Sequence, residues 1–456
     1  MRKLVHFSEK IAKYLLAATL IIIPILPKFP LINVPGTYVA IRFEDLLLLA
    51  LAVILIPKII LDFKKIIHDP IAIAFLIFLA VGLVSLIAGT VMTQTVTFNI
   101  GIFHWARRVE YIVPFFVAYL LIPKDKIAES IDFFLKLLLV VVFVAFLYAM
   151  GEHYLRFPVI TTQNDESSKG IALFWIKGSN TSSTFAGQYD LAAFMVMVVP
   201  MFLATFFVVK DKLSRLFALI ASGLGLWLLV NTFSRVAQLS YILAVSASLL
   251  LLRKFKGLGI ILLISIIFMF TSSGLSIRFG QAIHVIYERV TAGKSFSYLE
   301  NHFVAFADQI ATSPVPTPTP VPVIQDVSIA IRANVEWPRA IRAFIKNPML
   351  GTGYSSINLA TDNDYLRMLG ETGILGLAAF ALIFFRIGKV FQSAFPLRKK
   401  LSGLELAYVT GIIGAIIGTL MIATFIDLFE ASKFAIIFWL LLGLAVNLIK
   451  NKEYAK

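Results

Sequence analysis

The sequence predicts an all-α protein, a polytopic bundle of transmembrane helices with a long extracytoplasmic loop that contains short helices. Of its 456 residues, 59% are hydrophobic and the mean hydropathy is +0.88, whereas soluble domains are about 45–50% apolar. Apolar runs of about 20 residues recur along the chain, the length that crosses a bilayer as a helix. The runs are continuous and do not alternate, which excludes a membrane β-barrel.

We predict about twelve spans of about 20 residues each. They cover residues 11–27, 44–62, 71–90, 108–123, 131–150, 189–209, 215–231, 236–252, 257–274, 368–386, 404–425 and 434–449. Lysines and arginines gather in every second connection and near both ends, as at Lys64–Lys65 and Arg398–Lys400. By the positive-inside rule this side is cytoplasmic, so both termini are expected there, in a multi-pass protein of the inner (plasma) membrane.

The connections divide the chain into three parts. These are N-terminal transmembrane helices (1–214), a core with an extracytoplasmic loop at 275–367 (215–385), and C-terminal transmembrane helices (386–456). A loop of this length is usually functional or disordered. Within it, Ile277–Asp308 has the apolar spacing of interfacial helices, and Pro314–Pro322 has the composition of a polyproline spacer. Residues 329–344 are expected to form a second helical piece that Pro338 disturbs.

Composition also excludes several kinds of site. The chain has no cysteine, so disulfides, thiolate metal sites and a cysteine nucleophile are ruled out. The net charge of +15 is explained by loops that orient the helices, so we expect no nucleic-acid partner. The six histidines have no metal-binding spacing, and Walker and Rossmann patterns are missing. We expect no metal and no cofactor.

Arginines are the first candidate functional residues, since a guanidinium matches phosphate oxygens bidentately. Arg235 stands at the outer end of a span, where snorkelling to the interface is the alternative explanation. Arg332 lies close to Trp337 in a charged segment between apolar runs. Arg339 and Arg342 share a helical face, for which a solvated basic face is the simpler explanation. Arg235, Arg332 and Arg339 are therefore the candidate phosphate-binding residues.

Three carboxylates in the same segment are candidate catalytic residues: Asp362, Asp364 and Glu371. One of them would accept a proton from an attacking hydroxyl. The simpler interpretation is structural, because Asp and Asn are preferred helix caps and Asp364, Arg367 and Glu371 fall on one helical face. Asp364 and Glu371 could also ligate a metal, but the neighbouring arginines favour phosphate recognition without one.

Four motifs in this order resemble the O-antigen ligase and O-antigen polymerase family of bacterial membrane glycosyltransferases. They are Thr184–Ala192, Thr232-Phe-Ser-Arg235, Trp337 followed by Asn347-Pro-x-x-Gly351-x-Gly353, and Asp362-Asn-x-Tyr-Leu366 followed by Glu371-x-Gly-Ile-x-Gly376. Two positions depart from the family pattern. Arg332 stands five residues before the tryptophan instead of four. Asp362 replaces the histidine of the ligases, and this second departure favours polymerase-like or other family members over lipid A-core ligases.

The resemblance implies an inverting glycosyltransferase that needs neither metal nor nucleotide. Its donor would be a glycan linked to a polyprenyl diphosphate such as undecaprenyl diphosphate, and its product a surface polysaccharide of the cell envelope. Arg235 and Arg332 would bind the diphosphate, and Asp362 would be the first choice of base. The expected partners are the lipid-linked donor, a glycan or lipid acceptor, membrane lipid and a chain-length regulator.

Two other classes remain open on the sequence alone. The first is a transporter or exporter of a polysaccharide precursor or another solute. Transporters usually have paired repeats and ion sites within the membrane, whereas the charged segment here is expected at the outer surface. The second is a scaffold whose outer loop binds a partner protein. Transfer of glycan by the purified protein would separate the enzyme from both.

Overall fold

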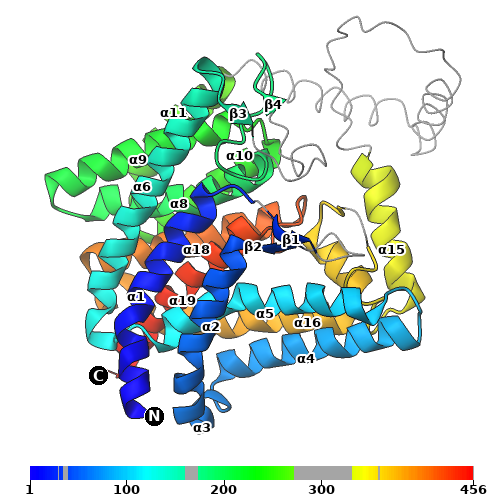
Figure 1. The fold of residues 1–456 in the computed structure, drawn as a ribbon. Helices are drawn as coiled ribbons and strands as arrows, with labels where there is room; N and C mark the ends of the chain where they lie inside the picture. The colour runs from blue at the N-terminus through cyan, green and yellow to red at the C-terminus, as the bar shows by residue number, and fades with distance from the viewer. Residues whose placement is uncertain (29, 34–39, 160–172, 272–330, 358–359, 455–456) are drawn as a thin grey trace, which may run out of the picture.

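The computed structural model describes residues 1–28, 30–33, 40–159, 173–271, 331–357 and 360–454, and long helices dominate this part of the chain (Figure 1). The long helices are α1 (Arg2–Ile25), α2 (Phe43–Leu61), α4 (Pro70–Val91), α5 (Phe98–Leu120), α6 (Ile127–Tyr154), α8 (Gln188–Val208), α9 (Lys212–Asn231), α10 (Arg235–Leu251), α11 (Phe255–Thr271), α16 (Asp364–Ser393), α18 (Gly403–Ile422) and α19 (Ser432–Tyr454). The shorter helices are α3 (Phe63–Ile66), η1 (Lys124–Lys126), η2 (Arg332–Glu336), α15 (Trp337–Lys346) and α17 (Leu397–Lys400). Two small antiparallel sheets pair β1 (Pro30–Asn33) with β2 (Ala40–Arg42), and β3 (Pro158–Val159) with β4 (Leu173–Phe174).

The all-α prediction is confirmed, and each of the twelve predicted spans falls on one of the twelve long helices. Within the described residues, seven of these helices are long and apolar enough to cross a membrane: α4, the helix that runs through η1 and α6, α8, α9, α16, α18 and α19. Helices α10 and α11 are apolar but have 17 residues each, and α2 and α5 carry several charges. The chain is therefore a multi-pass membrane protein, while the count of about twelve spans and the cytoplasmic termini stay predictions.

The core of the bundle is built around α8, α18 and α19, the most buried of the candidate spans. Small residues let α18 and α19 approach neighbouring helices closely. A Cβ at Gly414 of α18 would lie 2.3 Å from the carbonyl oxygen of Ala244 in α10, and one at Gly443 of α19 would lie 2.4 Å from that of Phe115 in α5. The close packing of α18 and α19 sets the position of the loop between them, which carries part of the site described below.

Both termini lie at one end of the molecule (Figure 1). Ion pairs between different helices connect the elements there. Lys13 of α1 lies 2.6 Å from Glu129 of α6, and Lys450 of α19 lies 2.8 Å from Asp69. Asp69 is also the N-cap of α4, since its side chain accepts the Ile71 N–H. Lys450, one of the basic residues near the C-terminus that are predicted to be cytoplasmic, thus helps to fasten this end of the bundle.

At the opposite end, Lys433 holds three segments together. This fully buried side chain donates to the carbonyl oxygens of Pro24 (3.3 Å), Leu26 (2.7 Å) and Thr184 (2.5 Å). A buried ammonium needs such acceptors, because leaving it unpaired would be costly. The end of α1, the segment before α8 and the start of α19 are thereby fixed to one another, and this places Tyr189 of α8 beside the site.

Two predicted features of the long loop fall outside the described residues. They are the interfacial helices at Ile277–Asp308 and the proline-rich spacer at Pro314–Pro322. The description resumes at residue 331, just before η2.

Candidate active site

Arg332 begins η2, a single π-helical turn that leads directly into α15. The turn closes through a hydrogen bond from the Trp337 N–H to the Arg332 carbonyl oxygen. Pro338 stands in the first turn of α15, where its missing N–H leaves no helical hydrogen bond broken. The helical piece predicted for residues 329–344 is confirmed for its described part, and the proline helps to begin the α-helix.

The guanidinium of Arg332 forms a forked pair with Asp362, which precedes α16. Its Nε and Nη2 lie 3.0 and 2.7 Å from Asp362 Oδ2. The central guanidinium carbon, Cζ of Arg332, lies 6.0 Å from the centre of the Tyr189 ring at the start of α8. Arg332 is only 8% exposed. Burial lowers the pKa of Arg332, but Asp362 and Tyr189 outweigh it and raise that pKa, so the guanidinium stays charged. A buried, charged arginine is thus held between three segments that are distant in sequence.

Asp362 occupies a left-handed backbone conformation, with φ of +48°. The residues on either side of it donate their backbone N–H groups to Asp427, which lies between α18 and α19. The Thr361 N–H lies 2.7 Å from Asp427 Oδ2, and the Asn363 N–H lies 3.1 Å from Oδ1. Burial raises the pKa of Asp362, and Arg332 lowers it in part. Asp427 therefore fixes the turn that aims Asp362 at Arg332.

Asp364, the first residue of α16, is held by the backbone of the loop between α18 and α19. Its carboxylate accepts the Leu428 N–H at 2.7 Å and the Phe429 N–H at 3.1 Å, and it is only 2% exposed. Asn363 is the N-cap of α16, accepting the Leu366 N–H at 3.0 Å. The capping role expected for this Asp-Asn-Asp run is thus confirmed for Asn363. Asp364 instead fastens the neighbouring loop.

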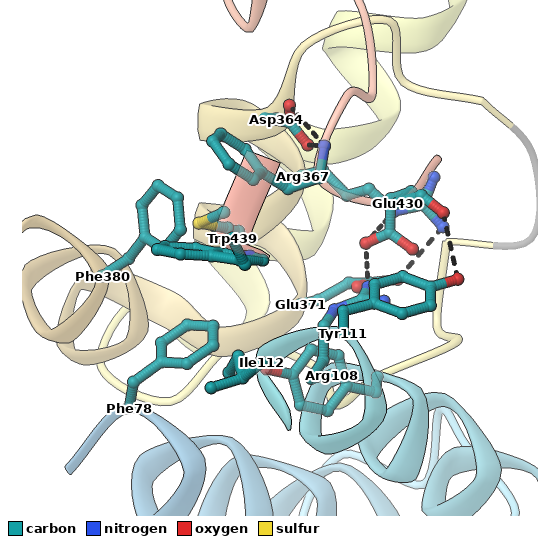
Figure 2. Close-up of a pocket in the computed structure, with 13 residues that line it drawn as sticks. Phe78, Arg108, Tyr111, Ile112, Asp364, Arg367, Glu371, Phe380, Glu430 and Trp439 are labelled. Atoms are coloured by element: carbon teal, nitrogen blue, oxygen red, sulfur yellow. Dashed lines mark hydrogen bonds and ion pairs between the residues drawn. The ribbon is translucent and has the colours of Figure 1, made fainter. Parts of the chain in front are cut away.

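Arg367 lies at the centre of a buried charge cluster (Figure 2). It lies 2.9 Å from Asp427, 3.6 Å from Glu371 and 3.6 Å from Glu430, and Glu430 also pairs with Arg108 of α5. The pair between Arg367 and Glu371 confirms the ion pair expected on this helical face. The cluster surrounds a cavity of about 30 Å³, which is too small for a sugar. The ion pairs of this cluster join α5, α16 and the loop before α19.

The turn at Asn347–Gly353 packs against a break in α16 at Gly373. The Thr352 and Gly353 N–H groups donate to the carbonyl oxygens of Gly370 and Glu371, at 2.9 and 2.8 Å. Gly373 has φ of +67°, and a Cβ there would lie 2.3 Å from the Met349 carbonyl oxygen. Because these N–H groups are used within the protein, they are not free to cradle a phosphate. The glycines serve the docking of the turn.

Part of the chain resembles a known protein family. Residues 220–381 match the family model described as O-antigen ligase. This stretch, about a third of the chain, is therefore similar to an O-antigen ligase domain. A comparison with curated proteins finds no match. The matched stretch of the O-antigen ligase domain includes Arg235, Arg332 and Asp362, so the resemblance to this family predicted from the motifs is confirmed.

Arg235, another candidate phosphate-binding arginine in the matched stretch, lies at the same end of the bundle as Arg332. Arg235 begins α10 after the N-cap Ser234. Four residues earlier, the Asn231 carbonyl oxygen accepts the Thr181 N–H at 3.0 Å. Residues 181–189 therefore reach from the chain next to Arg235 to Tyr189, which lies beside Arg332. These contacts place Arg332 beside the start of α8 and Thr181 beside the end of α9, four residues before Arg235.

Arg339 lies on α15 and is half-buried, whereas Arg342 is exposed. Among the described residues, Arg339 Nη1 is a buried donor without a hydrogen-bond partner. The structure thus distinguishes two arginines that the sequence places on one helical face. The described part of the O-antigen ligase domain contains no group of three side chains suited to hold a metal.

Sequence reasoning missed four charged residues of this region: Arg108, Glu336, Asp427 and Glu430. Three of them lie outside residues 220–381 and reach the O-antigen ligase domain only through the fold. A signal was present for Asp427 and Glu430, since they interrupt the apolar runs that become α18 and α19. Glu336 directly precedes Trp337 of the third motif, and no separate signal in the sequence marked it.

Proposed function

We propose that this protein is a glycosyltransferase of the inner membrane. It transfers or polymerises glycan from a polyprenyl diphosphate-linked donor at the extracytoplasmic face, for a surface polysaccharide. The family match supports glycan ligation or polymerisation by a multi-pass membrane protein. The observation that carries the donor assignment is Arg332, a buried guanidinium held at a helix start by one carboxylate.

Glycan transfer from a diphosphate donor mainly requires that the charge of the leaving group be neutralised. As the sugar–phosphate bond breaks, negative charge grows on the diphosphate, and preorganised guanidinium groups stabilise it without further rearrangement. Arg332 and Arg235 would supply this charge. Attack by an acceptor hydroxyl on the face opposite the diphosphate inverts the anomeric configuration. No step in this scheme requires a metal.

A carboxylate has to take the proton of the acceptor hydroxyl. Asp362 is a candidate, because burial raises its pKa. Its Oδ2, however, already accepts two hydrogen bonds from Arg332. Asp364 and Glu371 are more deeply buried, at 2% exposure each. In this proposal Asp362 mainly orients Arg332. Asp364 and Glu371 do not touch the substrate and serve to hold α16 in position.

The test is glycan transfer by the purified protein. The donor is undecaprenyl diphosphate-linked oligosaccharide, extracted from cells that lack this protein. We expect Arg332→Lys to keep the fold but reduce transfer by about 10²–10³-fold, because an ammonium cannot reproduce the forked contact. The matched control is Arg342→Lys, at an exposed position of α15, which should retain wild-type transfer. Electrophoresis of the glycan product measures both. Solute flux in proteoliposomes without any glycan transfer would contradict the proposal and favour a transporter.

A further inference from the structure

The carboxylates around Arg332 differ in whether they have a partner. Those with partners are Asp362 (Arg332), Asp364 (the Leu428 and Phe429 N–H groups), Asp427 (Arg367 and two N–H groups), Glu371 (Arg367) and Glu430 (Arg108 and Arg367). Glu336 is the exception. Among the described residues its Oε2 is buried without a hydrogen-bond partner, and no ion pair includes it. Such an atom in a native protein needs an explanation, and a missing ligand is one.

Glu336 is the last residue of the π-turn that begins at Arg332. Residues four apart in a helical turn lie on one face, so the carboxylate follows the guanidinium along the helix. Single π-turns occur frequently at functional sites. Here the turn places a carboxylate that has no partner among the described residues next to the arginine proposed to hold the diphosphate.

Other unpaired polar atoms lie near Glu336. Within the described residues, Trp337 Nε1, Arg339 Nη1 and Thr361 Oγ1 are also buried without hydrogen-bond partners. Trp337 is the next residue along the chain, Arg339 follows in the first turn of α15, and Thr361 adjoins Asp362. Hydroxyl-rich ligands both donate and accept hydrogen bonds, so donors beside a carboxylate suit a sugar. This group of atoms fits a carbohydrate acceptor better than it fits a second phosphate.

The charged groups that face Glu336 come from four segments of the chain. Arg332 and Arg339 lie on η2 and α15, Asp362 precedes α16, and Asp427 lies between α18 and α19. Burial first, and then the charge of Asp362, raise the pKa of Glu336 to about 7, and Arg332 opposes them. A base whose pKa lies near the working pH is effective, since it is both available and strong.

We propose that Glu336 is the general base that activates the acceptor hydroxyl, an inference that rests on the glycosyltransferase function proposed above. Its carboxylate takes the hydroxyl proton as the acceptor oxygen forms a bond to the anomeric carbon. The bond from that carbon to the diphosphate oxygen breaks, and the polyprenyl diphosphate leaves with the electron pair. Arg332 neutralises the leaving group, and Asp362 keeps Arg332 in place.

Glu336→Gln tests this role, because it keeps the shape of the side chain and removes the basic oxygen. We expect transfer to fall by about 10²–10⁴-fold, the usual contribution of a general base. Binding of the undecaprenyl diphosphate-linked donor, measured by its thermal shift of the protein, should change less than twofold. The matched control is Glu405→Gln, a glutamate that pairs with Lys452 at the other end of the bundle. It should retain wild-type transfer.

The pH profile separates a base from a structural residue. Wild-type transfer should rise as the pH passes through about 7, because the base must be deprotonated. The residual activity of Glu336→Gln should lack this rise, and Glu336→Asp should recover part of the rate. An infrared titration of the carboxyl band, wild type minus Glu336→Gln, should show one group that titrates near that pH.

Three results would overturn the proposal. Glu336→Gln with more than a third of wild-type transfer would remove the residue from the mechanism. A pH rise that is lost in Asp362→Asn but kept in Glu336→Gln would assign the base to Asp362. Both leave the glycosyltransferase function intact, whereas a wild-type protein that transfers nothing from the lipid-linked donor would remove that function and the role of Glu336 with it.

Discussion

At the scale of single residues, the site depends on how each buried charge is paired. Asp362 fixes the guanidinium of Arg332 by accepting its hydrogen bonds, and Asp427 fixes the backbone on either side of Asp362 in the same way. Asp427 also pairs with Arg367, so one carboxylate serves three groups. Removing one member of a buried ion pair leaves the other charge uncompensated, which is more costly than losing an exposed pair.

We therefore expect Asp427→Ala to destabilise the protein by about 3–5 kcal/mol, because Arg367 and two N–H groups lose a buried acceptor. Thermal unfolding of the detergent-solubilised protein measures the loss. Asp132→Ala is the control, since its pair with Lys136 is exposed and is worth at most about 1 kcal/mol. Equal unfolding temperatures for the two variants would show that Asp427 does not stabilise the site.

At the scale of elements, α16 is the part that organises the site. Its first turn bears Asp364 and Arg367, and its break at Gly373 receives the turn from Asn347 to Gly353. The break requires a positive φ that residues with a Cβ adopt only at a cost. The glycines of the third and fourth motifs thus have one physical purpose, which is to let a turn and a broken helix share their hydrogen bonds.

Gly373→Ala should cost about 1–3 kcal/mol from its backbone alone, because φ of +67° with ψ of −171° is a conformation that essentially only glycine adopts. The Cβ contact at 2.3 Å from the Met349 carbonyl oxygen adds to this cost. Gly388→Ala is the control in the same helix. Nothing lies within 4 Å of its Cβ position, so the change should stabilise α16 by up to about 1 kcal/mol. Opposite shifts in unfolding temperature are expected, and a neutral Gly373→Ala would contradict the strained break.

At the scale of the whole molecule, the helices divide the charges between two ends. The end with both termini (Figure 1) has ion pairs between different helices. The other end has the arginines and carboxylates of the proposed site. The distribution of lysines and arginines in the connections predicts that the first end is cytoplasmic. The proposed chemistry would then take place at the outer leaflet.

The lack of cysteine allows a direct test of this orientation. Lys65→Cys, at an exposed position after α2, and Lys346→Cys, at the exposed end of α15, place one thiol at each end. In intact spheroplasts a membrane-impermeant maleimide should label only Lys346→Cys. Lys65→Cys should react only after permeabilisation. The reverse pattern would place the proposed site on the cytoplasmic side.

Much of the fold could be predicted because membrane helices are specified locally. An apolar run of about 20 residues has to satisfy its backbone hydrogen bonds within itself, so its position can be read without knowledge of its neighbours. The family motifs likewise identified Arg332 and Asp362 as residues of one segment, before their contact was known. The partners of these residues could not be predicted, because they lie on other helices and have no fixed spacing from the motif.

The sequence by itself therefore determined the helical membrane fold, the family and the segment that carries the candidate site. Only the tertiary structure decided which charges meet. Within the part of the chain that it describes, it paired Arg332 with Asp362, occupied Asp364 and Asp427 with backbone groups, and left Glu336 without a partner. The physical reason is that hydropathy acts within a segment, whereas the pairing of a buried charge depends on which distant side chains the packed helices bring within a few ångströms.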